Sequence, residues 1–194
     1  MRILRRTELI NTLFSHLHFK YLPMRTLLFY TLLFLVLPIQ SQSYDKHLKT
    51  NITSEGILYY IYNFKMKSKS EGAKSLEYDF THLNERDHVT LTATCITTDI
   101  ANIDSFYLSL PTGEKFECGV EKIYTEHKSK WRTRFRVNFS YDLWQEMYGQ
   151  NVPFRIILLC KDKKQIIFED SAKAWKKNRK KLSQIQEVIE VNKN

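Results

Sequence analysis

Three arginines recur at every second position of the segment Trp131–Phe139, which has the sequence WRTRFRVNF. In a β-strand, Arg132, Arg134 and Arg136 would lie on one side, about 6.5 to 7 Å apart. Such a row of guanidinium groups can bind carboxylates or phosphates in a bidentate manner. The alternative, which we favour, is an ordinary solvent-facing side of a strand with acidic residues opposite on its neighbours. The candidate partners in that case are Glu114, Glu117 and Glu121.

A second basic cluster lies near the C-terminus, where the spacing of apolar residues predicts a helix over residues 172–191. Its apolar stripe is narrow and suits packing on a sheet or on a partner helix; it contains Trp175, Leu182, Ile185 and Ile189. We expect the helix to dock on the domain, with contact to a protein partner or an anionic surface as alternatives. Together with the arginine row, the candidate binding surface includes Trp175, Lys176, Lys177, Arg179 and Lys180.

The segment HLNERDH contains four potential metal ligands within seven residues, namely His82, Glu85, Asp87 and His88. Their spacing matches no recognised metal motif, so we predict no metal site. The sequence also has no nucleophile elbow, phosphate-binding loop or dinucleotide fingerprint. We therefore predict no catalytic residues and no cofactor.

Each of the three cysteines belongs to an alternating apolar series, so Cys95, Cys118 and Cys160 should all point inward. In an exported protein, three cysteines permit one disulfide with three possible pairings. The other interpretation is that all three pack as small apolar side chains. The sequence leaves the pairing open.

The elements that would position these residues are mostly strands. Alternating apolar and polar residues predict seven or eight of them, at residues 56–64, 76–80, 88–98, 104–110, 115–124, 131–139, 153–160 and 165–169. A serine cap and a terminal glycine predict a short helix over residues 140–149. Residues 44–54 are expected to be a flexible lead-in, and residues 65–74 a solvated loop.

This pattern predicts a mainly β fold. We expect an antiparallel, immunoglobulin-like β-sandwich with a short internal helix and a C-terminal helix. The alternative is a small antiparallel barrel with a terminal helix.

Residues 24–43 have the layout of a secretory signal peptide. Met24 and Arg25 form a basic head, residues 27–37 are continuously apolar, and Ser41 and Ser43 supply small residues for cleavage. The apolar run is shorter than the roughly 20 residues that a membrane-spanning helix needs. We predict export with cleavage near Ser43. Residues 1–23 would be untranslated or an extended leader, residues 44–170 the β-rich domain, and residues 171–194 a basic C-terminal helix.

The formal net charge of +9 belongs to the two ends of the chain. Residues 44–170 contain equal numbers of basic and acidic residues, so the domain has no general attraction for nucleic acid. We therefore expect no nucleic-acid partner.

A short signal, a strand-rich domain rich in lysine, isoleucine and tyrosine, and a closing helix with Trp175, Lys176 and Lys177 form a recognisable layout. It resembles that of small exported proteins of unknown function from Bacteroides-type Gram-negative bacteria. The resemblance implies residence in the periplasm or outside the cell, and it implies no activity.

We expect a non-enzymatic binding or protein-interaction module with a partner in the envelope or outside the cell. It would touch the membrane only transiently, through the signal peptide. The alternative is a secreted hydrolase or small-ligand carrier with a cleft near His82, His88 and Arg134.

The predicted signal peptide can be tested by N-terminal sequencing of the protein isolated from outside the cytoplasm. We expect the mature chain to begin at or near Tyr44, because the small residues of the cleavage motif end at Ser43. A mature product that still begins at Met1 or Met24 would contradict the prediction.

Overall fold

The computed structural model describes residues 46–193, so the predicted leader and signal peptide lie outside the described residues. The described chain forms one antiparallel sheet of ten strands and two α-helices. The strands are β1 (Leu48–Thr53), β2 (Gly56–Ser68), β3 (Ala73–Leu83), β4 (His88–Thr97), β5 (Ile103–Ser109), β6 (Lys115–Cys118), β7 (Val120–His127), β8 (Trp131–Ser140), β9 (Arg155–Cys160) and β10 (Gln165–Glu169). The helices are α3 (Tyr141–Gly149) and α4 (Ala172–Lys193).

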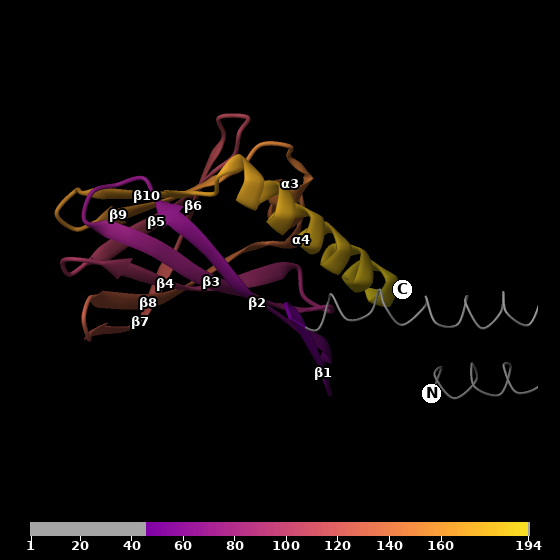
Figure 1. The fold of residues 1–194 in the computed structure, drawn as a ribbon. Coiled ribbons are helices and arrows are strands. Elements are labelled where there is room, and N and C mark those ends of the chain that lie inside the picture. Colours follow the sequence, from indigo (N-terminus) through magenta and orange to yellow (C-terminus); the bar gives the residue numbers. More distant parts are fainter. Residues whose placement is uncertain (1–45, 194) are drawn as a thin grey trace, which may run out of the picture. The chain divides into compact units, whose positions relative to one another are not determined.

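The sheet is continuous and bends so that its two halves face each other (Figure 1). Its strand order is β6-β5-β9-β10-β2-β3-β4-β8-β7, and β1 pairs with β2 outside this path. Phe106 on β5 and Phe135 on β8 meet across the interior with ring centroids 6.3 Å apart. The predicted mainly antiparallel β fold with an internal and a C-terminal helix is confirmed. The sheet is not closed into a barrel, since β6 and β7 end the strand order.

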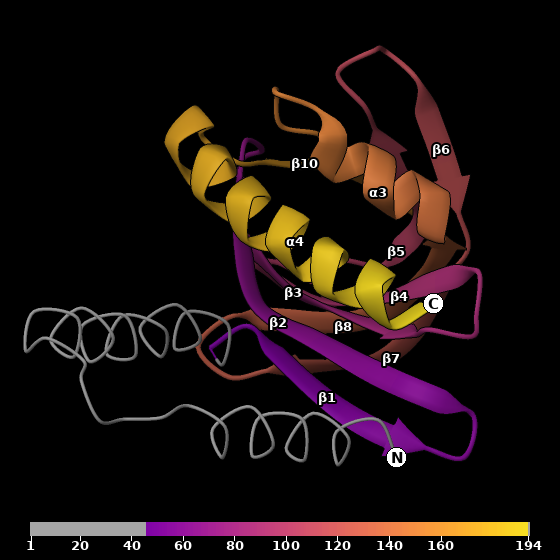
Figure 2. The ribbon, with the colours of Figure 1, turned by 90° about the vertical axis from the view of Figure 1, so that its right-hand side faces the viewer.

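Helices α3 and α4 lie beside each other across one open end of the bent sheet (Figure 2). Ser140 caps α3, because its side chain accepts a hydrogen bond from the Leu143 N–H at 3.2 Å. Both helices bury their apolar faces between the sheet halves. For amphipathic helices, this burial is the main source of stability.

The ring of Tyr148 on α3 joins these parts. Its centroid lies 6.1 Å from Phe80 on β3, 5.7 Å from Phe154 just before β9, and 5.5 Å from Trp175 on α4. Phe80 lies in one half of the sheet, and Phe154 leads into β9 in the other half. One aromatic cluster therefore connects both halves and both helices.

The apolar stripe predicted for the C-terminal helix is confirmed, and all of it is buried. None of Trp175, Leu182, Ile185 and Ile189 is more than 2% exposed. Helix α4 is thus part of the domain core, as the docking prediction required.

The side chain of Arg179 attaches α4 to the end of α3. Its Nε donates to the Tyr148 carbonyl at 3.1 Å, and one of its terminal nitrogens donates to the Gly149 carbonyl at 3.3 Å. The last turn of α3 has no basic residue of its own. Arg179 therefore supplies from α4 the positive charge that stabilises a helix C-terminus.

Two segments expected to be irregular, residues 65–74 and residues 44–54, contain strand residues. The expected loop at residues 65–74 is partly strand, since β2 extends to Ser68 and β3 begins at Ala73. A bulge lies between Ile61 and Phe64, where Asn63 adopts a φ of 70°. The bulge changes which positions of β2 face the core. Phe64 and Met66 are therefore buried, although strict alternation from Ile61 would turn them outward.

The expected flexible lead-in contains β1, which pairs along its whole length with β2. Most of β1 is exposed, so hydrogen bonding to β2 rather than burial stabilises this strand. Its sequence has no apolar alternation that would predict a strand. The single strand expected at residues 115–124 is interrupted at Gly119: β6 pairs with β5, whereas β7 pairs with β8. No helix within residues 46–193 has the length and apolarity required to span a membrane.

Candidate functional site

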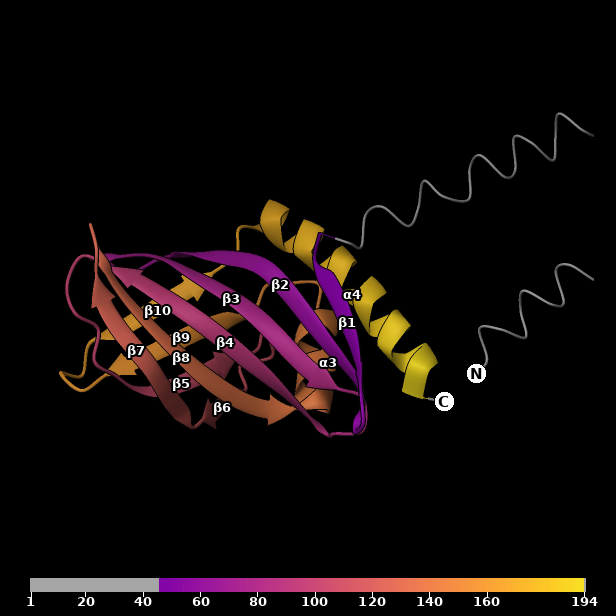
Figure 3. The same cartoon turned by 90° about the horizontal axis from the view of Figure 1, so that it is seen from below.

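Strand β8 lies between β4 and β7 (Figure 3). Its alternating burial places the arginine row on the side that faces away from the core. Arg132 forms ion pairs with Glu77 at 3.4 Å and with Glu126 at 3.7 Å. Arg136 pairs with Glu121 at 3.4 Å. The interpretation of this row as an ordinary strand face with cross-strand acidic partners is therefore supported, and the expected partner Glu121 is confirmed.

The middle arginine of the row makes a different contact. A terminal nitrogen of Arg134 donates to the Thr94 hydroxyl at 3.2 Å. The expected partners Glu114 and Glu117 were wrong, because Glu117 lies on β6, which pairs with β5 and not with β8, and Glu114 lies in the turn before β6. The row is thus a mixed, charge-compensated surface rather than three converging guanidinium groups.

The cleft proposed for His82, His88 and Arg134 is not formed. His82 points into the core, where it is 1% exposed and stacks on Tyr141 with ring centroids 4.5 Å apart. His88 lies exposed on the opposite face, although its carbonyl oxygen is 3.0 Å from His82 Nδ1. Arg134 pairs with Thr94, six residues along β4 from His88, or about 20 Å by strand geometry. These side chains therefore do not converge on one ligand.

The cysteines and acidic residues offer no metal centre. Within residues 46–193, no group of three or more His, Cys, Asp or Glu side chains could hold a metal ion. All three cysteines are free; Cys95 and Cys160 are buried and Cys118 is half-buried. Burial raises the pKa of Cys95 to about 12, so its thiol stays protonated and unreactive near neutral pH.

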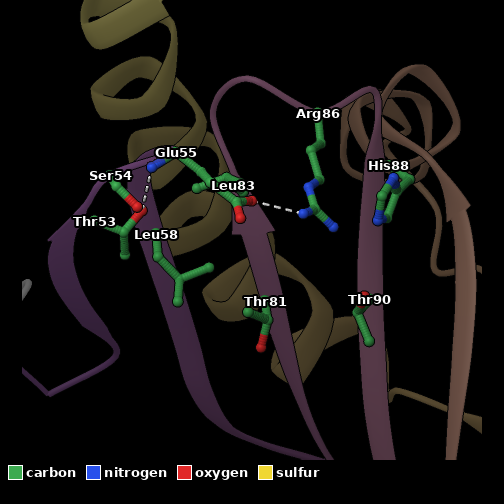
Figure 4. A pocket seen from close by; sticks show the side chains of 9 residues that line it. All are labelled: Thr53, Ser54, Glu55, Leu58, Thr81, Leu83, Arg86, His88 and Thr90. Atoms are coloured by element: carbon green, nitrogen blue, oxygen red, sulfur yellow. Dashed lines mark hydrogen bonds and ion pairs between the residues drawn. The ribbon is translucent and has the colours of Figure 1, made fainter.

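A pocket of about 320 Å³ opens on the outer face of the sheet, between the β1–β2 and β3–β4 turns (Figure 4). We call it the outer-face pocket. The Arg86–Glu55 ion pair, at 2.7 Å, spans the two turns. The lining residues are Thr53, Ser54, Glu55, Leu58, Thr81, Leu83, Arg86, His88 and Thr90.

The geometry of this pocket depends on a glycine. Gly56 has a φ of 126°, and a Cβ there would lie 2.4 Å from the Asn84 side-chain oxygen. That oxygen accepts a hydrogen bond from the Ile57 N–H at 2.8 Å and so joins the two turns. In the described chain, no hydrogen bond connects the His88 ring to any hydroxyl of the pocket.

The larger concavity, about 560 Å³, lies between α4 and the loop that connects α3 to β9. We call it the basic groove. The apolar surface of the groove comes mainly from the loop, through Pro153 and the 56% exposed Val152, because Trp175 lines the groove but is only 2% exposed. Its lining includes three cations and no acidic residue, and consists of Asn151, Val152, Pro153, Ala172, Trp175, Lys176, Arg179, Lys180 and Ser183.

The cations of the basic groove have different roles. Arg179 is held in place, since besides the α3 carbonyls it donates to Asn151 Oδ1 at 2.6 Å. Lys176 and Lys180 are exposed and form no ion pair within the described residues. The groove therefore has a fixed cationic wall and two lysines that are available to a ligand.

Four of the basic-helix residues singled out from the sequence line this groove: Trp175, Lys176, Arg179 and Lys180. Lys177 does not line it. The sequence did not indicate the opposite wall, Asn151 to Pro153, because a short loop of mixed polarity has no periodic pattern. The only available signal was Pro153, four residues after the end of the predicted helix, with Asn151 two residues before it.

Sequence reasoning also missed a polar group in the core. Asp170 follows β10 and is 5% exposed, and its carboxylate accepts a hydrogen bond from the Asn178 side chain at 3.0 Å. Burial raises the pKa of Asp170 above its usual range. Burial and the nearby Asp170 carboxylate also raise the pKa values of Tyr78 and Tyr148. The signal that could have predicted a buried carboxyl here is the alternation of inward-facing positions Ile166, Phe168 and Asp170.

No protein-family model matches the chain, and no curated protein or solved structure is significantly similar to it.

The raised pKa of Asp170 predicts a specific pH dependence of stability. An aspartate has an ordinary pKa of about 3.9 in an unfolded chain. When a carboxyl has a higher pKa in the folded state than in the unfolded state, its ionisation destabilises the folded protein. The free energy of unfolding then falls as the pH rises from the unfolded-state pKa to the folded-state pKa. Asp170→Asn cannot ionise, so we expect it to be more stable than the wild-type protein at pH 7. Urea unfolding should show this advantage shrinking as the pH falls from the raised pKa toward about 4, and absent at lower pH.

The matched control is Asp162→Asn, which changes an exposed aspartate in the β9–β10 turn. We expect its free energy of unfolding at pH 7 to differ from that of the wild-type protein by less than about 0.5 kcal/mol. A D170N variant that is less stable than wild type at pH 7, by an amount that grows with pH, would contradict the interpretation.

Proposed function

We propose that the protein is an exported, non-enzymatic binding module that contacts its partner through the basic groove. The observation that carries the proposal is the groove itself, in which two unpaired lysines stand beside apolar surface in a concavity without acidic residues. Its volume is within the range of about 300 to 1,000 Å³ typical of ligand sites. The outer-face pocket is smaller, and its arginine and glutamate neutralise each other.

The contacts that join the two walls of the groove support a binding role. One wall is a helix whose apolar stripe is buried, and the other is a loop connected to that helix through Arg179 and Asn151. A preformed site loses less conformational entropy when it binds than a flexible one does. The basic groove is therefore well suited to recognition.

The signal peptide predicted for residues 24–43 supports export, and the charge distribution supports a protein partner. Outside the leader and the C-terminal helix, the domain is neutral and would not draw nucleic acid to itself. The positive charge of α4 is concentrated in its first half, beside the groove. Long-range attraction would guide an acidic surface toward this end of the helix.

Affinity capture tests the proposal. The processed protein and two double variants are immobilised and exposed to envelope extract, and the retained proteins are identified and quantified. Lys176→Glu/Lys180→Glu reverses the groove lysines. Lys173→Glu/Lys177→Glu is the matched control, since it makes the same charge change at the same spacing on α4 outside the groove. We expect the wild-type protein and the control to retain the same partner, and the groove variant to retain at least about tenfold less of it.

Equal retention of every captured protein by both variants would contradict a role for the groove. So would a wild-type protein that retains nothing above the level of the bare matrix.

A further inference from the structure

The dimensions of the basic groove restrict what it can hold. Its helical wall extends from Ala172 to Ser183, which corresponds to about 16 Å along α4 at 1.5 Å per residue. An extended peptide of five residues covers about the same length. The groove is therefore long enough for a short strand-like segment.

The spacing of the two unpaired lysines matches such a segment. Lys176 and Lys180 are one turn apart, so they are separated by about 6 Å along the helix axis. Alternate side chains of an extended chain lie on the same side, about 6.5 to 7 Å apart. Carboxylates at two alternate positions of a peptide can therefore each meet one of these lysines.

The opposite wall suits the residue between the two acidic ones. In an extended chain, that side chain points the other way, toward the loop wall, where Val152 and Pro153 offer apolar surface. Arg179 lines the groove on the same helix, between the two lysines in sequence, and is held by three acceptors, so it adds positive potential without having to move. The two walls thus present complementary chemistry to the two sides of one extended chain.

We propose that the basic groove binds an extended acidic peptide segment in which acidic and apolar residues alternate. The inference rests on the proposed binding function and specifies the partner's chemistry. A lipid surface fits less well for two reasons. The site is concave, and Val152 is the one strongly exposed large apolar side chain among the described residues that line it. A flat anionic membrane would also use Lys173 and Lys177, which lie on α4 outside the groove.

The test uses two labelled synthetic peptides of identical composition and measures binding to the processed protein by fluorescence anisotropy. The first contains Glu-Val-Glu-Val-Glu between glycines, and the second contains Glu-Glu-Glu-Val-Val. We expect the alternating peptide to bind at least about fivefold more tightly than the blocked one, and its affinity to fall as salt is added.

The variants assign the binding to the groove. Lys176→Glu/Lys180→Glu should weaken the alternating peptide by at least about tenfold, whereas Lys173→Glu/Lys177→Glu should change its affinity by less than about threefold. If the groove variant fails to fold, Lys176→Gln/Lys180→Gln removes the same charges without reversing them, and the same ranking is expected. Equal losses in the two pairs, or equal affinity for the two peptides, would overturn the proposal.

A vesicle assay separates the lipid alternative. Vesicles of phosphatidylglycerol and phosphatidylcholine are sedimented with the protein, and we expect the protein to stay in the supernatant at physiological salt. Binding to vesicles without binding to the alternating peptide would overturn the peptide proposal. If neither peptide binds while the groove variant still loses its captured partner, the acidic-peptide inference fails and the proposed binding function stands.

Discussion

The aromatic contact centred on Tyr148 is the interaction on which the rest of the architecture depends. The bent sheet leaves one end open, and an antiparallel sheet with an uncovered apolar face is not stable in water. Tyr148 closes that end by touching Phe80 on β3, Phe154 in the loop that leads into β9, and Trp175 on α4. This contact acts together with the other buried side chains of both helices, among them Trp144 on α3 and Leu182 on α4, to fix the helices relative to the sheet.

The basic groove is a consequence of the same packing. Trp175 is buried against Tyr148, and the next turn of α4 brings Arg179 to the carbonyls that end α3. This capping contact sets the distance between α4 and the loop that begins at Gln150. The lysines at positions 176 and 180 then lie on the solvent side of a helix whose other side is core. The packing of the core therefore determines the geometry of the basic groove, the surface for which we propose a binding function.

Much of the fold could be predicted from the sequence wherever one side of an element is buried. The segment Trp131–Ser140 and the stripe of α4 have clear periods, and both are found as expected. Prediction failed where the period shifts or disappears. The bulge at Asn63 changes the phase of β2, and β1 is stabilised by pairing alone. The sequence indicated the lysines of the groove but not its loop wall. That wall is placed by the contact between Asn151 and Arg179, which are far apart in the chain.

The central claim is that α4 is part of the domain core and therefore holds the groove lysines in place. Urea unfolding of two matched variants tests it directly: Leu182→Ala removes a fully buried side chain of α4, and Val191→Ala removes one that is 76% exposed on the same helix. The account predicts that the first lowers the free energy of unfolding by about 2 to 5 kcal/mol and the second by less than about 0.5 kcal/mol. Equal, small effects of the two substitutions would contradict it.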